Sequence, residues 1–171
     1  MPENSLPKQG AAEPSGAPMN VAFINPFIES TLRSLEMMAG VTAEKTGLAV
    51  KEDLITTYDI SAIIGLTGDT SGSVILSFPA DLACRIAGNM LMEEVPEMNQ
   101  AVEDAIGEIG NIVVGDARRL LIQDGFSLNI SVPTVVVGKG HKISRSGDIP
   151  CIAIPFRTPF GEFEVNVGLK D

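Results

Sequence analysis

The chain has 171 residues, of which 44% are hydrophobic, and a formal net charge of −10. This length is enough for a single domain whose core needs neither disulfides nor metals. The negative charge disfavours binding to nucleic acids and to anionic membranes, which require clusters of Lys and Arg. The only basic candidates, Arg118–Arg119 and residues 139–145, are short.

Two cysteines and one histidine provide little basis for a metal site. Cys84 and Cys151 form no CxxC pair and have no histidine close by, whereas zinc takes three or four such ligands. Isolated cysteines fit a reducing compartment, although these two could pair. No segment has the length and hydrophobicity of a membrane span, and the N-terminus lacks the pattern of a signal peptide. We therefore expect a cytoplasmic protein.

The first 18 residues are rich in Pro, Gly, Ala, Ser and Glu, and they predict a disordered leader before a folded unit over residues 19–171. Asn25 and Pro26 then predict the start of a helix, as N-cap and first helical residue. Apolar residues follow at helical spacing as far as Ala39, and Gly40 ends the run.

A block of strands is expected next. Residues 48–51, 58–66 and 73–78 have strand composition, and the turn-forming residues 67–72 predict a hairpin between the last two. Residues 79–91 predict a second, shorter helix. The longest helix is expected over residues 99–123, with Gly125 just beyond its end. Its apolar stripe comprises Val102, Ile106, Ile109, Val113 and Leu120.

The C-terminal third returns to strand composition. Residues 130–137 predict a strand interrupted by Pro133, Ile143 marks a weak strand, and residues 151–156 and 163–169 predict a hairpin. Apolar and polar residues alternate over 163–169, which predicts one solvent-exposed face. Grouped strands with separate helices indicate an α+β fold, in which long helices pack on one side of a largely antiparallel sheet.

The long helix contains the residues of greatest chemical interest. At about 100° per residue, Glu108 and Asn111 fall opposite the apolar stripe, and their spacing of three makes them neighbours. Asp104 and Arg118 are expected on the same outer face. A Glu and an Asn on a polar helix face are often no more than a solvated surface, and an E-x-x-N string arises frequently by chance.

Gly107 and Gly115 are also expected on this outer face. Each glycine in a helix interior costs about 1 kcal/mol relative to alanine, so it requires a reason. One reason is the close approach of a partner protein. The other is tight packing of the helix on the sheet, which would account for Gly107 and Gly110.

Glu108-Ile109-Gly110-Asn111, with Asp104 before it and Gly115 after it, resembles the active helix of the CheC/CheX chemotaxis phosphatase family. Three further segments resemble the family in the same order along the chain: residues 25–28, residues 64–68 with 72–74, and residues 133–138. The resemblance covers about residues 20–169. The order of these motifs along the chain makes the resemblance specific.

CheC-like members of the family carry two E-x-x-N helices. In this chain the first helix reads Glu29-Ser30-Thr31-Leu32, so a leucine stands where the second asparagine is needed. The chain is therefore similar to the single-site CheX branch, which implies a homodimer.

The resemblance implies a phosphatase that acts on the aspartyl phosphate of a CheY-type response regulator. Asn111 would position the attacking water, and Glu108 would pair with a lysine of the regulator. Asp104, Gly107, Gly115 and Arg118 would help to dock this partner. The resemblance implies no cofactor of the chain's own, because Mg²⁺ is expected on the regulator.

Two alternatives remain open at the level of sequence. One is a non-catalytic adaptor that docks a response regulator or a flagellar motor component on the same scaffold. Retention of both Glu108 and Asn111 favours catalysis. The other is a small-molecule sensor, for which the sequence shows no convergent polar pocket. His141 is expected to be a surface or strand residue without a nearby Ser or Cys to build a catalytic triad.

Overall fold

The computed structural model describes residues 21–51, 54–55, 58–139, 141–143 and 151–170, so the expected leader over residues 1–18 lies outside the described part. The helices are α1 (Val21–Ala39), α2 (Ala80–Leu91) and α3 (Gln100–Gln123). The strands are β1 (Glu44–Lys45), β2 (Ala49–Lys51), β3 (Leu54–Ile55), β4 (Ile60–Gly68), β5 (Ser71–Phe78), β6 (Leu128–Ile130), β7 (Thr134–Val137), β8 (Lys142–Ile143), β9 (Cys151–Thr158) and β10 (Gly161–Lys170).

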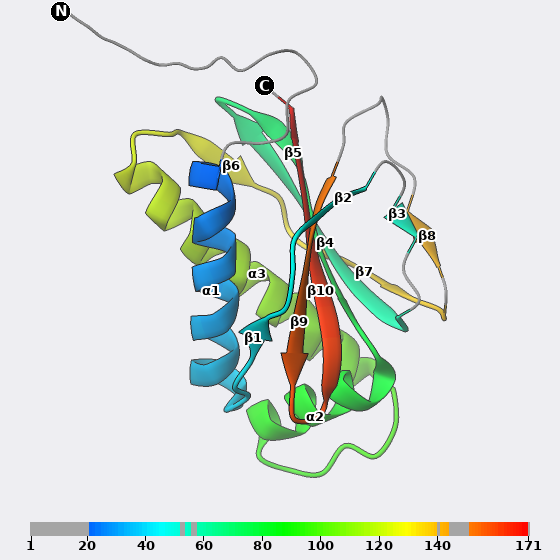
Figure 1. Cartoon of the computed structure of the whole chain (residues 1–171). Helices are drawn as coiled ribbons and strands as arrows, with labels where there is room; N and C mark the ends of the chain where they lie inside the picture. Colours follow the sequence, from blue (N-terminus) through cyan, green and yellow to red (C-terminus); the bar gives the residue numbers. More distant parts are fainter. Residues whose placement is uncertain (1–20, 52–53, 56–57, 140, 144–150, 171) are drawn as a thin grey trace, which may run out of the picture.

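The main sheet is antiparallel in every pairing that the described residues form. Its order is β1-β9-β10-β5-β4-β6, with β2 also pairing with β9 and β7 with β4, while β3 and β8 form a separate pair. In Figure 1, α1 and α3 lie side by side against the sheet, and α2 lies near its lower end. The α+β fold expected from the sequence is confirmed.

The first helix does not begin where the sequence indicates. Asn25 was expected as its N-cap, but α1 already includes Val21 and contains Pro26 in its interior. A proline inside a helix removes one backbone hydrogen bond and is ordinarily costly. Here the apolar face prevails, because Ile24 and Phe27 are buried in the core on either side of the proline.

The ends of α3 agree with the prediction. The side chain of Asn99 accepts a hydrogen bond from the backbone N–H of Val102 at 3.1 Å, as an N-cap does. Gly125 follows the helix with a φ of 97°, a value that favours glycine. The strand expected over residues 130–137 forms as β6 and β7, which are separated at residues 131–133, where Pro133 has no N–H for the ladder.

The face of the sheet away from the helices is more buried than the alternation of apolar and polar residues in β10 predicts. Phe163 stacks between Phe78 and Phe156 in the core, with ring centroids 5.0 and 4.9 Å apart. On the opposite face, however, Asn166 is fully buried, since β10 is a central strand and Asn166 lies between Ile75 of β5 and Ala153 of β9. The expectation of one solvent-exposed face over 163–169 is therefore wrong at this position.

Helix α3 lies in a trough with a wall on each side. On one side α1 runs antiparallel to it (Figure 1). The ring centroids of Phe23 and Phe126 are 4.4 Å apart, and Arg33 donates a hydrogen bond to Asp116. On the other side lie β6 and β7, and the sheet forms the floor. Only a narrow strip of α3 therefore faces solvent.

Candidate active site

Glu108 and Asn111 lie one turn apart on the strip of α3 that faces solvent. Glu108 is exposed and Asn111 is half-buried. They differ because Asn111 is turned toward the wall made by β6 and β7, whereas Glu108 projects directly outward. The pair thus offers one free carboxylate and one amide whose movement is restricted by its surroundings.

The glycine between these two residues allows α3 to lie directly on the sheet. A Cβ atom built on Gly110 would come within 3.0 Å of Ala62 Cβ and 3.0 Å of Ile64 Cδ1. At such distances a side chain fits only if the neighbouring atoms or the helix shift by a few tenths of an ångström. Gly110 therefore sets the height at which α3 holds Glu108 and Asn111, as the packing alternative proposed.

Gly107 was expected on the outer face, and that expectation is wrong. It is buried, and a Cβ atom there would lie 3.3 Å from Val135 Cγ2 and 3.9 Å from Pro133 Cγ. The wall formed by β7 covers a sector of α3 that a helix lying on a flat sheet would expose. Gly107 serves close packing within the chain, and its backbone is not offered to a partner.

Gly115 and Asp104 lie on the outer face as expected. A Cβ atom on Gly115 would meet nothing within 4 Å, so the space above this residue is open. Asp104 is exposed and accepts a hydrogen bond from Gln100 Nε2 at 2.9 Å. The surface around Glu108 and Asn111 therefore has little side-chain bulk on the side of Gly115.

Arg118 was expected beside them as a docking residue, but its position is different. It is half-buried, and its Nε donates a hydrogen bond to the backbone carbonyl of Leu128 in β6. The side chain thus ties the last turns of α3 to the edge of the sheet. Arg118, like Gly107, is covered by the wall of β6 and β7, although helical periodicity alone predicts that it is exposed to solvent.

The sequence did not indicate a cluster of charges between α1 and α3. Asp116 accepts hydrogen bonds from Arg33 of α1 and from Arg119, the latter at 2.8 Å. Burial raises the pKa of the Asp116 carboxyl, but the hydrogen bonds from the two arginines outweigh burial and hold this pKa below its ordinary value. The cluster joins the two helices at Asp116, the residue next to the open position at Gly115.

A second polar group that the sequence did not indicate lies on the opposite face of the sheet. His141 Nε2 is 2.7 Å from Ser61 Oγ, which is 2.7 Å from Ser77 Oγ. The expectation that His141 has no serine nearby is therefore wrong, since 80 residues separate it from a partner that only folding brings close. His141 Nδ1 donates to the carbonyl of Gly138, so a neutral ring accepts at Nε2 from Ser61. Both serines are fully buried, which excludes a nucleophile that substrate can reach.

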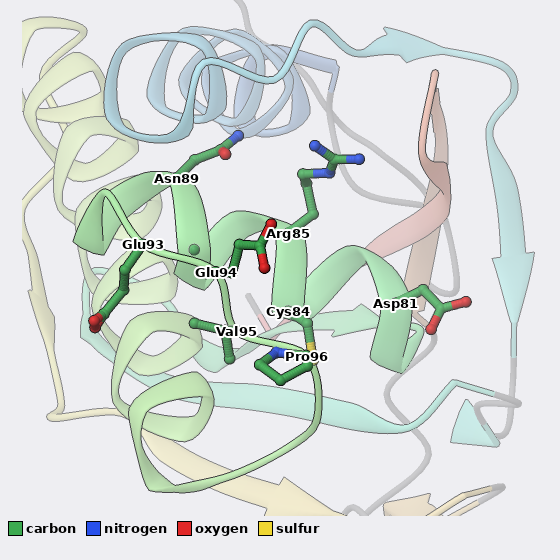
Figure 2. A pocket seen from close by; sticks show the side chains of 9 residues that line it. Asp81, Cys84, Arg85, Asn89, Glu93, Glu94, Val95 and Pro96 are labelled. Atoms are coloured by element: carbon green, nitrogen blue, oxygen red, sulfur yellow. The ribbon is translucent and has the colours of Figure 1, made fainter.

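A pocket of about 360 Å³ lies beside α2, away from Glu108 and Asn111, and is lined by Asp81, Cys84, Arg85, Gly88, Asn89, Glu93, Glu94, Val95 and Pro96. In Figure 2 its charged side chains do not converge, and Asp81 and Glu93 extend to opposite sides. Arg85 lies over the Phe160 ring at 4.1 Å. Burial, with the nearby acidic residues, raises the pKa of the Cys84 thiol, which keeps it protonated and unreactive.

Neither Cys84 nor Cys151 forms a disulfide bond. Within the described ranges, no group of three or more His, Cys, Asp or Glu side chains is placed to hold a metal ion. None of the helices in that part of the chain is long and apolar enough to span a membrane. Glu108 and Asn111 bring a carboxylate and an amide to the surface of α3, which Gly110 allows to lie directly on the sheet.

Comparison with known proteins places this helix in context. Residues 60–157 match the family model for the chemotaxis phosphatase CheX. The chain is 27% identical over 132 residues to the CheY-P phosphatase CheX of Thermotoga maritima, a match that covers 77% of this chain and 85% of that protein.

Solved structures agree over nearly the whole described chain. A CheC-like superfamily protein from Shewanella sp. PV-4 is 34% identical, with a TM-score of 0.84 over 90% of this chain and 100% of that one. The CheX of a CheX–CheY–BeF₃–Mg²⁺ complex from Borrelia burgdorferi is 27% identical, with a TM-score of 0.76 over 87% of this chain and 98% of that one.

Proposed function

The chain belongs to the CheX family of chemotaxis phosphatases, and we propose that it hydrolyses the aspartyl phosphate of a CheY-type response regulator with Asn111 and Glu108. One observation carries the residue assignment. Glu108 and Asn111 lie one turn apart on the solvent-facing strip of α3, with open space at Gly115 beside them. The proposal is further supported by the relative from Thermotoga maritima, which is named as a CheY-P phosphatase, and by the Borrelia burgdorferi relative in complex with CheY.

Asn111 is proposed to place the attacking water. Its amide oxygen accepts a hydrogen bond from water and its nitrogen donates one elsewhere, so the side chain can hold a water in line with the phosphorus atom. The water oxygen forms the new bond to phosphorus while the bond to the aspartyl oxygen breaks, which yields inorganic phosphate and a free aspartate. An amide is a poor base, so the rate gain comes from positioning. The half-buried setting of Asn111 suits this role because it restricts side-chain motion.

Glu108 is proposed to pair with a lysine in the regulator's active site. Its carboxylate is exposed and forms no salt bridge within the described part of the chain, so it is available to a partner. Such a pair would fix the orientation in which Asn111 enters the regulator. We place Mg²⁺ on the regulator, where it would neutralise phosphoryl charge, and assign this chain no cofactor of its own.

A homodimer in the cytoplasm is part of the same proposal. Light scattering during gel filtration would test the oligomeric state of the purified protein directly. A monomeric mass over the working concentration range would contradict the dimer, while leaving the proposal for Glu108 and Asn111 untouched.

The function is tested by phosphate release from a phosphorylated CheY-type regulator in the presence of Mg²⁺. The wild-type protein should accelerate release, and Asn111→Ala should lower kcat by about 100-fold or more, the usual range for losing a group that acts on the transition state. Glu108→Ala should raise KM and also lower kcat, because it would loosen the docking that aligns Asn111.

Gln123→Ala provides the matched control, since it removes an exposed amide at the last residue of α3, twelve positions from Asn111, and should leave turnover unchanged. No acceleration by the wild-type protein with any cognate regulator would contradict the proposal. Tight binding without acceleration would favour the adaptor instead. Full activity of Asn111→Ala would refute the residue assignment alone.

A further inference from the structure

We infer that the response regulator docks on a band of surface that runs across α3 from Val132 to Met37, with Asn111 and Glu108 between them. This inference rests on the proposed function and adds the contacts that would hold the partner. Val132 is 82% exposed and Met37 is 75% exposed, which makes them two of the most solvent-exposed large apolar residues in the described part of the chain. Both side chains are therefore available for contact with a partner.

Val132 is placed beside Asn111 by two contacts between α3 and the sheet edge. Gly107 lies against Pro133 and Val135, and Arg118 bonds to the carbonyl of Leu128, so the two segments run antiparallel. Asn111 lies between these contacts on the helix, and Val132 lies between them on the opposite segment.

The turn that carries Val132 is held rigidly. Ser131 accepts a hydrogen bond from Gly65 N–H at 2.8 Å, and its own N–H donates to the Gly65 carbonyl at 3.0 Å. Pro133 has a restricted φ and packs on Gly107. Val132 is therefore displayed from a fixed position, which lowers the entropy lost when a partner covers it.

Met37 is placed on the other side of the pair by the contacts between α1 and α3. Phe23 contacts Phe126, and Arg33 is hydrogen-bonded to Asp116. The two helices are therefore antiparallel, and residues later in α1 lie beside residues earlier in α3. Met37 is one turn beyond Arg33 and thus lies level with Ile112, one turn before Asp116. Ile112 is itself adjacent to Glu108 on the helix surface.

The occupant of this band follows from geometry. Asn111 can reach an aspartyl phosphate only if the regulator's surface rests on the strip of α3 around it. A stable protein–protein interface buries about 800 Å² on each partner, more than one narrow helical strip can supply. The regulator must therefore also cover both walls of the trough, where Val132 and Met37 stand. Apolar contacts that flank a polar centre exclude water from it, so a charge introduced there would have to be desolvated when the regulator docks.

The test compares three variants of the full chain in the phosphate-release assay. Val132→Asp and Met37→Asp should each raise KM for the phosphorylated regulator by about tenfold with kcat changed less than about twofold, since they would weaken docking without altering the water site. Val50→Asp is the matched control. It introduces the same charge at another exposed apolar position, since Val50 is 58% exposed. Val50 lies on β2, which pairs with β9 near the edge of the sheet away from β6 and β7, so the substitution should leave KM and kcat unchanged.

The outcomes separate this inference from the function on which it rests. If the wild type is active and Asn111→Ala is not, the function stands, and unchanged KM values for Val132→Asp and Met37→Asp would then overturn the docking band alone. Equal KM increases in all three variants, Val50→Asp included, would also overturn it, because the effect would then reflect added charge and not position. All three substitutions are at exposed sites, and circular dichroism verifies that each variant is folded.

Discussion

Gly110 of α3 lies directly against Ala62 of β4, so closely that a Cβ atom on the glycine would be 3.0 Å from that of the alanine. The contact lies between Glu108 and Asn111 in the sequence, on the side of the helix that faces the sheet. The distance of these two side chains from the sheet is thus fixed by a residue that never meets the partner.

Gly110→Ala should lower both stability and activity. The added methyl group overpacks the core between Ala62 and Ile64, at a cost of about 1–3 kcal/mol in the free energy of unfolding, although alanine favours helix formation. Urea denaturation measures this loss. Residual folded protein should show reduced kcat if the helix, rather than Ala62 and Ile64, shifts to make room, because Asn111 would then be displaced. An increase in stability would show that the trough accommodates a side chain.

Gly115→Ala should have the opposite effect on stability. The space above Gly115 is open, so alanine should stabilise α3 by roughly 0.5–1 kcal/mol through helix propensity alone. If the regulator approaches the backbone there, phosphatase activity should fall even though the protein is more stable. Thermal unfolding and phosphate release on the same sample test both parts, and unchanged activity would place the partner away from Gly115.

Asp116→Asn should weaken the junction between α1 and α3 in a pH-dependent manner. The folded pKa of Asp116 is depressed, so its ionised form contributes stability above the unfolded value of about 3.9, and this contribution is lost as pH falls through the folded pKa. Urea denaturation should show a difference of about 1 kcal/mol between wild type and variant at pH 7. That difference should shrink as pH falls below the unfolded value, and a gap of undiminished size in that range would contradict the electrostatic explanation.

Ser61→Ala should reduce stability but not catalysis. The substitution breaks the hydrogen-bonded chain from His141 to Ser77 and leaves buried polar atoms with fewer partners, at a cost of about 1–3 kcal/mol. Phosphate release per folded molecule should remain at the wild-type level, because the serine is buried on the face of the sheet opposite α3. A large loss of kcat in folded protein would instead assign the serine–histidine pair a functional role.

The elements and the pair on α3 were predictable because both follow from local repeats. A period of 3.6 residues placed Glu108 next to Asn111 and opposite Val102, and the Asn99 cap and Gly125 marked the helix ends. The same repeat misplaced Gly107 and Arg118, and it assigned Leu120 to the buried stripe where the structure buries Leu121. The errors at Gly107 and Arg118 have one cause, which is that the wall of β6 and β7 buries a wider sector of α3 than a flat sheet would.

The sequence by itself determined the α+β order of elements, the two polar residues that can act together and the likeness to CheX phosphatases, because these depend on neighbours within a few turns or on motifs in order. Tertiary structure decided which polar residues remain available. In the folded chain Arg118 is hydrogen-bonded to Leu128, His141 to Ser61 and Arg33 to Asp116. These pairs are separated by 10, 80 and 83 positions in the sequence. Glu108 remains exposed because neither wall of the trough reaches the top of the helix, a property of how α1, α3 and the sheet pack that no local pattern contains.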